Sequence, residues 1–295
     1  MATLSGTNTG AFKGTLVRVY DRNGGAFLGA TISNASTGAW SFTTPNTKPC
    51  IAYAMASAGD IYGDKLVFAS EFDGTNGGTL STDVTGKTLT WNNGLTLSSA
   101  QAYQGATSIG PISGTKALTF SATGLSMPNT ASHWIRAYIY PTSMPGTSAH
   151  VFGVSTRTPY KGLSFGFNGL NVTLDVPNTG TFTGSNVPLN INQWNRFDVS
   201  IINGYMYFFV NGTLSLSNNR GSNTPIWESA GSIIVGNASI SGTFNCPFPG
   251  YIDLVEFHYG MDIGSTSFTP ADSIGFGFPG TPTENCLIFD NLTPV

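Results

Sequence analysis

The residues best suited to acid–base chemistry are two carboxylates, Asp253 and Glu256, in the run 251–256 (YIDLVE). Two carboxylic groups can hydrolyse a glycosidic bond when both flank the same bond. Successive side chains of a strand point to opposite faces, so a regular strand separates residues that are three apart. We therefore expect a non-catalytic strand in which one acid is solvated and the other contacts a loop.

Other reactive side chains are scattered along the sequence. The histidines His133, His150 and His258 share no ligand spacing with acids or cysteines, and we expect them at the surface or at strand ends. Three widely spaced cysteines, Cys50, Cys246 and Cys286, form neither a disulfide framework nor a metal cluster, so small buried side chains are expected. Cys50 and Cys286 could still pair if their strands meet. No Ser-His-Asp set, phosphate loop or dinucleotide motif is found, so the sequence predicts no catalytic, cofactor or metal residues.

The amino-acid composition argues against several classes of protein. The chain has 295 residues, of which only 9% are charged, and its net charge is -3. This charge argues against a nucleic-acid binder, and the aromatic content of 12% argues against disorder. No run approaches the ~20 apolar residues of a membrane span, and the first residues lack the features of a signal peptide. We therefore expect that the protein does not insert into a membrane. We also expect that it assembles in the cytoplasm of a host cell.

Short runs rich in Val, Ile, Phe, Tyr and Thr, separated by Gly, Asn, Ser and Pro, predict an all-β protein. Residues 1–64 are expected to form a small β-sandwich, and 65–264 a large antiparallel jelly roll. Residues 265–295 are expected to form an extended segment with a closing strand, in which 281–295 either complete the small sandwich or add to a neighbouring subunit. Asn211-Gly212 predicts a tight hairpin between two apolar runs.

Aromatic residues divide into two groups by context. Trp227, Tyr103 and Tyr160 lie in loop-like segments, where rigid rings usually serve recognition. Four tryptophans lie within strand patterns and are expected in the core: Trp40, Trp91, Trp134 and Trp194.

The large unit resembles a laminin G-like domain, the concanavalin A-like jelly roll. Six segments match in order: 72–74 (FDG), 133–141 (HWIRAYIYP), 187–197 (VPLNINQWNRF), 205–212 (YMYFFVNG), 232–236 (SIIVG) and 250–257 (GYIDLVEF). Some of these domains hold Ca²⁺ at the sandwich rim, and the resemblance would make Asp73, Asn76 and Asp253 the oxygen donors. The chain has few acids for such a site, so we expect no bound metal.

The same resemblance bears on catalysis. Retaining β-glucanases with this jelly roll carry Glu-x-Asp-x-x-Glu on one strand, and Tyr251 stands here in the place of the nucleophile. The resemblance therefore implies a protein that is not an enzyme.

The small unit resembles β-sandwich modules of bacteriophage structural proteins. The matching segments are 19–22 (VYDR), 38–41 (GAWS) and 287–295 (LIFDNLTPV), with the large unit lying between the last two. This resemblance implies a virion protein, such as a capsid decoration, head fibre or tail-associated component. Its partners would be other virion proteins, further copies of itself and, through the jelly roll, host surface glycans. The alternative is a carbohydrate-binding, lectin-like module of a bacterial surface or secreted protein.

Overall fold

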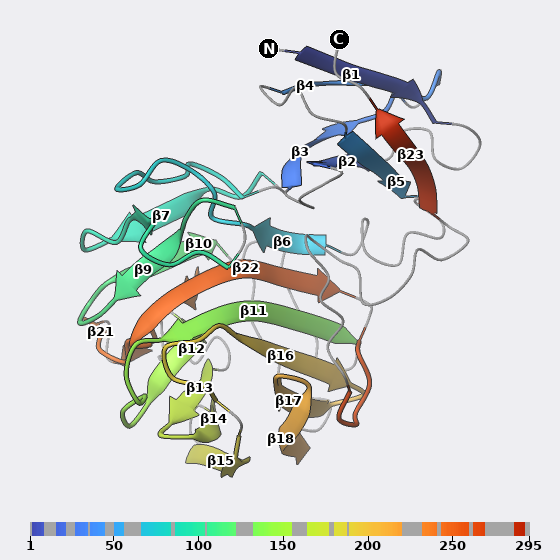
Figure 1. Cartoon of the computed structure of the whole chain (residues 1–295). Helices are drawn as coiled ribbons and strands as arrows, with labels where there is room; N and C mark the ends of the chain where they lie inside the picture. Colours follow the sequence, from blue (N-terminus) through green and yellow to red (C-terminus); the bar gives the residue numbers. More distant parts are fainter. Residues whose placement is uncertain are drawn as a thin grey trace. The chain divides into compact units, whose positions relative to one another are not determined.

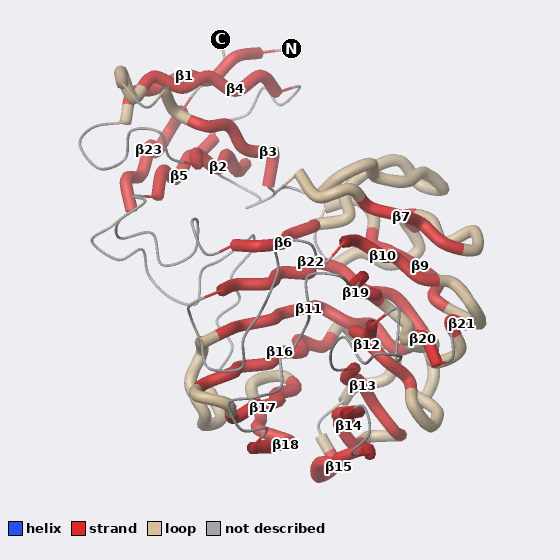
Figure 2. Tube along the Cα trace, turned by 180° about the vertical axis from the view of Figure 1, so that it is seen from behind, coloured by secondary structure: helices blue, strands red, loops and turns tan. Residues whose placement is uncertain are grey.

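The computed structural model describes residues 2–8, 16–21, 27–34, 36–44, 50–55, 66–83, 86–103, 105–121, 132–154, 164–176, 180–187, 189–219, 232–240, 243–259, 262–268 and 286–292. Every regular element in these ranges is a β-strand, which confirms the predicted all-β class (Figures 1 and 2). None of the described residues forms a helix long and apolar enough to cross a membrane. The chain divides into two units: residues 1–65 with 271–295, and residues 66–270.

The smaller unit contains a four-stranded sheet and a two-stranded sheet. The first has the order β23 (Cys286–Leu292), β5 (Cys50–Met55), β2 (Leu16–Asp21) and β3 (Phe27–Ile32), and the second pairs β1 (Ala2–Thr7) with β4 (Ala39–Thr44). Trp40 is buried against Gly6, where a Cβ atom would lie 2.6 Å from the indole ring. The sequence patterns did not predict β1, so the partner of the Trp40 strand was missed.

Strand β23 pairs with β5 of the same chain, although about 230 residues separate them. In this register Cys286 lies opposite Met55, and Leu292 lies opposite Cys50. The two cysteines are thus at opposite ends of the strand pair, roughly 16 Å apart at ~3.3 Å per residue. A disulfide needs α-carbons within about 7 Å, so the suggested Cys50–Cys286 pairing is wrong even though the strands meet.

The larger unit is a sandwich of two antiparallel sheets. The seven-stranded sheet has the order β15 (Gly180–Asn186), β14 (Asn171–Val176), β13 (Ser164–Asn168), β12 (Ala149–Val154), β19 (Ser232–Val235), β10 (Ala117–Ser121) and β7 (Leu89–Asn92). The eight-stranded sheet has the order β18 (Thr213–Asn219), β17 (Tyr205–Val210), β16 (Asn195–Ile202), β11 (His133–Pro141), β22 (Gly250–Tyr259), β9 (Ser108–Ile112) and β8 (Leu97–Ser98), with β6 (Leu66–Ser70) also paired to β22. A short pair, β20 (Ser239–Ile240) and β21 (Thr243–Phe244), completes the unit.

Phenylalanine rings fill the space between the two sheets. Phe68 stacks on Phe120 with ring centroids 3.9 Å apart, and Phe257 packs edge-on against Phe152 at 5.2 Å. These side chains come from both sheets and are buried. The alternate residues of the eight-stranded sheet therefore face away from this core, on the outer face.

The predicted hairpin at Asn211-Gly212 is confirmed. It joins β17 to β18, and both residues adopt positive φ, at 50° and 76°. Asn and Gly tolerate this conformation at low cost, which is why a local pattern could predict it.

Candidate ligand-binding surface

A β-bulge in β22 brings the two acids of the YIDLVE run to the same face. Tyr138 of β11 lies opposite Asp253 and Arg136 lies opposite Glu256, so one extra residue of β22 is inserted between the two pairs. The bulge coincides with Leu254, whose φ is 46°. Because Arg136 and Tyr138 are two residues apart, their partners share a face. The expectation that these acids lie on opposite faces was therefore wrong.

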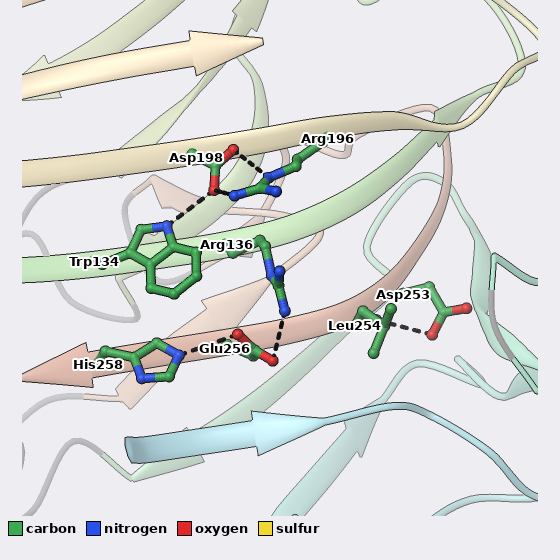
Figure 3. Close-up of polar contacts among 8 residues, drawn as sticks. All are labelled: Trp134, Arg136, Arg196, Asp198, Asp253, Leu254, Glu256 and His258. Atoms are coloured by element: carbon green, nitrogen blue, oxygen red, sulfur yellow. Dashed lines mark hydrogen bonds and ion pairs between the residues drawn. The ribbon is translucent and has the colours of Figure 1, made fainter. Parts of the chain in front are cut away.

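The outer face of β11, β16 and β22 carries a set of buried polar and aromatic side chains, shown in Figure 3. We call it the polar row: Trp134, Arg136, Arg196, Asp198, Glu256 and His258. Each of these residues is at most 3% exposed. Buried charges are tolerated only when they are paired, so their contacts determine what the row can do.

Arg136 and Glu256 form a buried ion pair, with 2.8 Å between Nη2 and Oε1. The other carboxylate oxygen of Glu256 lies 3.1 Å from His258 Nε2. Burial tends to lower the pKa of the Arg136 guanidinium, but the charge of Glu256, helped by Tyr138 and Asp198, raises it above its usual value. Arg136 is therefore a permanent cation whose charge is already balanced within the protein.

A second ion pair joins Arg196 to Asp198 through two hydrogen bonds of 2.7 and 3.0 Å. The same carboxylate accepts a hydrogen bond from the Trp134 indole N–H at 2.9 Å. The Trp134 ring stacks on His258, with centroids 4.8 Å apart. Trp134 is buried as predicted, but it lies in the polar row and not in the apolar core.

A cluster of aromatic rings continues from the polar row along the same face. We call it the aromatic surface: Tyr103, Tyr138, Tyr140, Trp194 and Tyr251. Tyr103 stacks on Tyr138 at 3.7 Å, and Trp194 contacts Tyr103 and Tyr140 edge-on at 5.9 and 5.4 Å. Tyr103, Tyr140 and Trp194 are only half-buried, so their rings reach solvent.

The aromatic surface tests two predictions about individual residues. Trp194 was expected in the core, but it precedes β16 and is half-exposed. Tyr103 lies outside the strands, as expected, and its ring packs with the surface. Trp227 and Tyr160 lie outside the described residues.

The three candidate calcium ligands accept hydrogen bonds from backbone amides. Asp253 accepts from the N–H groups of Tyr103 and Leu254, both at 2.9 Å. Asp73 accepts from the N–H groups at positions 106 and 107, and Asn76 accepts from the N–H at position 99. These contacts fasten position 103 to β22 and positions 99, 106 and 107 to the loop that follows β6. Among the described residues, no group of three acids, histidines or cysteines is placed to hold a metal ion.

The histidines lie near strand ends, which is one of the two predicted locations, and all three are buried. His133 begins β11 and packs near the Tyr259 ring, at 5.1 Å. In His150, Nδ1 lies 2.9 Å from the carbonyl oxygen of Ser148, and Nε2 lies 2.7 Å from an Asp175 carboxylate oxygen. Both ring nitrogens of His150 therefore have partners within the sandwich.

Trp40 is buried in the smaller unit, as expected. Trp91 packs against the core between the two sheets, as expected, although it is only half-buried, and its indole N–H donates to the carbonyl of Leu80 at 2.8 Å.

Sequence reasoning did not single out Arg136, Arg196 or Asp198. A usable signal was present, because both strands alternate polar or aromatic residues with apolar ones. In 133–141 the residues Trp, Arg, Tyr and Tyr alternate with Ile, Ala and Ile, and 195–202 shows the same pattern. This alternation indicates that one face of the sheet points away from the core. It does not indicate that the side chains on that face are buried.

The chain belongs to the concanavalin A-like lectin/glucanases superfamily. The model of this family matches residues 113–260, half of the chain. The match lies within the larger unit, so the resemblance of the smaller unit to bacteriophage modules remains a prediction. No curated protein matches the chain.

Several solved structures are similar to the larger part of the chain. Domain 4 of an extracellular arabinanase from Geobacillus stearothermophilus, in complex with arabinotriose, has 19% identity and a TM-score of 0.47, covering 66% of this chain and 93% of that one. The ligand binding domain of botulinum neurotoxin serotype D, in complex with N-acetylneuraminic acid, has 10% identity and a TM-score of 0.48, covering 68% and 49%. The binding domain of Paraclostridial Mosquitocidal Protein 1 has 11% identity and a TM-score of 0.47, covering 68% and 50%.

The matches thus cover about half of the length of each toxin domain. The family match and the two antiparallel sheets together make the larger unit a concanavalin A-like jelly roll.

Proposed function

We propose that the larger unit is a carbohydrate-binding module that holds an uncharged glycan on its aromatic surface. The observation that carries this proposal is the half-buried ring cluster of Tyr103, Tyr140 and Trp194 on an outer sheet face. Sugar rings present C–H groups that pack on aromatic faces, and such rigid rings lose little conformational entropy when they bind. Membership of a superfamily of lectins and glucanases supports the same function.

The charge arrangement favours an uncharged ligand. Arg136 is neutralised by Glu256, Arg196 is neutralised by Asp198, and the Asp253 carboxylate accepts two backbone N–H groups. These groups are buried, so they stiffen the platform and offer no unbalanced positive charge to an acidic sugar.

We further propose that the module does not hydrolyse its ligand. Tyr251 stands where the related glucanases carry their nucleophile, so the carboxylate that their retaining mechanism uses is missing from this position. Glu256, at the position of the acid, is buried in contacts with Arg136 and His258.

The test is a glycan array probed with the full chain, followed by titration calorimetry with the best ligand. The variant W194A should weaken binding at least tenfold, because it removes a half-buried ring from the aromatic surface. The matched control W91A removes a half-buried tryptophan from the other sheet and should bind as the wild type does. Binding to no glycan, or equal loss in both variants, would refute the proposal. Release of sugar products would refute the non-enzymatic part.

Assembly into a bacteriophage virion is a second candidate for the whole chain. One support is the resemblance of the smaller unit to phage modules. A second is that β23, which follows the lectin-like unit in sequence, pairs with β5 and so completes a sheet of the smaller unit. In this setting the smaller unit would dock on the particle. Mass spectrometry of density-purified particles tests it: many copies per particle would support a virion protein, whereas absence from the particle band would leave the glycan-binding module by itself.

A further inference from the structure

Residues 262–268 follow β22 and lie against the outer face of the eight-stranded sheet. We call this segment the strap. The backbone N–H of Ile263 donates to Ser200 Oγ at 3.3 Å, and the N–H of Phe268 donates to the Gly212 carbonyl at 2.9 Å. In the opposite direction, the N–H of Leu214 donates to Ser267 Oγ at 2.9 Å. The strap is therefore attached to β16, to the β17–β18 turn and to β18.

Phe268 of the strap covers the end of the polar row nearest to the aromatic surface. Its ring centroid lies 5.4 Å from the guanidinium carbon of Arg196, and it packs edge-on against Phe209 at 5.3 Å. Arg196 lies directly opposite Tyr138 in the β11–β16 register. A ligand on the aromatic surface could therefore reach Arg196 if Phe268 moved away.

Arg196 has one N–H group with no acceptor in the part of the chain that the structure describes. Nε and Nη2 donate to Asp198, whereas Nη1 is buried and has no hydrogen-bond acceptor among the described residues. A buried donor without an acceptor costs free energy, and a ligand oxygen at this position would remove that cost.

We propose that Arg196 belongs to an inner subsite for one uncharged sugar unit, which Phe268 fills when no ligand is bound. The proposal rests on the glycan-binding function above. The phenyl ring packs over Arg196 and Phe209 where a sugar ring would lie, and a sugar hydroxyl would accept from Nη1. A hydroxyl fits better than a carboxylate, because Asp198 already balances the charge of Arg196. Long glycans then gain the inner subsite by displacing the strap, whereas single sugars bind only to the aromatic surface.

The test uses the full chain, the variant F268A and the matched control F244A, which removes a half-buried phenyl ring from β21. The probes are glucose-, galactose- and arabinose-based oligosaccharides of one to six units, titrated by calorimetry. F268A should bind the longer oligosaccharides at least fivefold more tightly than the wild type and single sugars equally well, and F244A should match the wild type throughout. In the wild type, a long ligand should also speed hydrogen exchange at the amides of Leu214 and Phe268.

The possible results separate this inference from the proposed function. Equal affinities of F268A and the wild type at every length would overturn the inner subsite and leave the aromatic surface as the whole site. Weaker binding by F268A would mean that Phe268 itself contacts the glycan, which also overturns the inference. Binding by neither protein would overturn the proposed function and the inference together, and binding by F268A alone would support both.

Discussion

The variant E256Q tests whether the polar row is held together by its buried charges. Glutamine keeps the shape of the side chain but removes the charge that balances Arg136, which is fully buried. Removing one partner of a buried ion pair costs about 3–5 kcal/mol. The amide oxygen can still accept a hydrogen bond from the guanidinium, which returns about 1 kcal/mol. We therefore expect the larger unit to lose about 2–4 kcal/mol of unfolding free energy.

The measurement is urea unfolding of the full chain, read by pulsed hydrogen exchange of peptides from β11 and β22. This readout follows the larger unit separately from the smaller one. With a urea dependence of about 3 kcal/mol per molar, the transition should move down by about 1 M. The raised pKa of Arg136 keeps its stabilising charge at every pH below that pKa, and the charge is lost only as the pH rises through it. The guanidinium itself should thus add no pH dependence between pH 6 and about 9.

The double variant R136M/E256Q provides the decisive comparison. It removes the cation together with its partner, so it should be more stable than E256Q by about 1–3 kcal/mol. If the stability lost by the double variant instead equals the sum of the losses measured for R136M and for E256Q, the two side chains are not coupled. The ion pair described above would then not form in solution.

Three further predictions concern other parts of the molecule. D253A removes the acceptor of the Tyr103 amide, so hydrogen exchange at that amide should become faster. Glycan binding should weaken about tenfold, as is expected for W194A. An unchanged exchange rate at the Tyr103 amide would show that Asp253 does not hold this loop in place. Deleting 286–292 should unfold the smaller unit, detected as loss of exchange protection in β5, while the larger unit keeps its transition. Adding Ca²⁺ or EDTA should shift the melting temperature by less than about 1 °C, since amides occupy the candidate oxygens; a larger shift would reveal a metal site.

Features governed by local chemistry could be predicted from the sequence. The all-β class followed from strand and turn composition, and the Asn211-Gly212 hairpin followed from two residues that accept positive φ. The bulge at Leu254 could not be predicted in this way, because leucine rarely adopts positive φ and only the pairing with β11 imposes it. Asp253 and Glu256 lie on the same face of the sheet only because of that bulge.

The candidate site was predicted only in part, for a related reason. Tyr103 was recognised as an aromatic residue in a loop, but its stacking on Tyr138 depends on the fastening of that loop by Asp253. Trp194 was assigned to the core because it adjoins a strand pattern, and its half exposure depends on where β16 begins. Arg196 and Asp198 became apparent only once their strand was placed beside β11.

The pairing of β5 with β23 has a consequence for biosynthesis. A ribosome that has just made Met55 must add about 230 residues before it reaches Cys286. At roughly 5–20 residues per second, this takes about 12–46 s. Residues 66–270 are synthesised during that interval, while β5 waits with one edge unpaired. A nascent chain of this protein therefore carries an open strand edge for many seconds, and that edge is the point at which chaperones or a second nascent chain would first engage it.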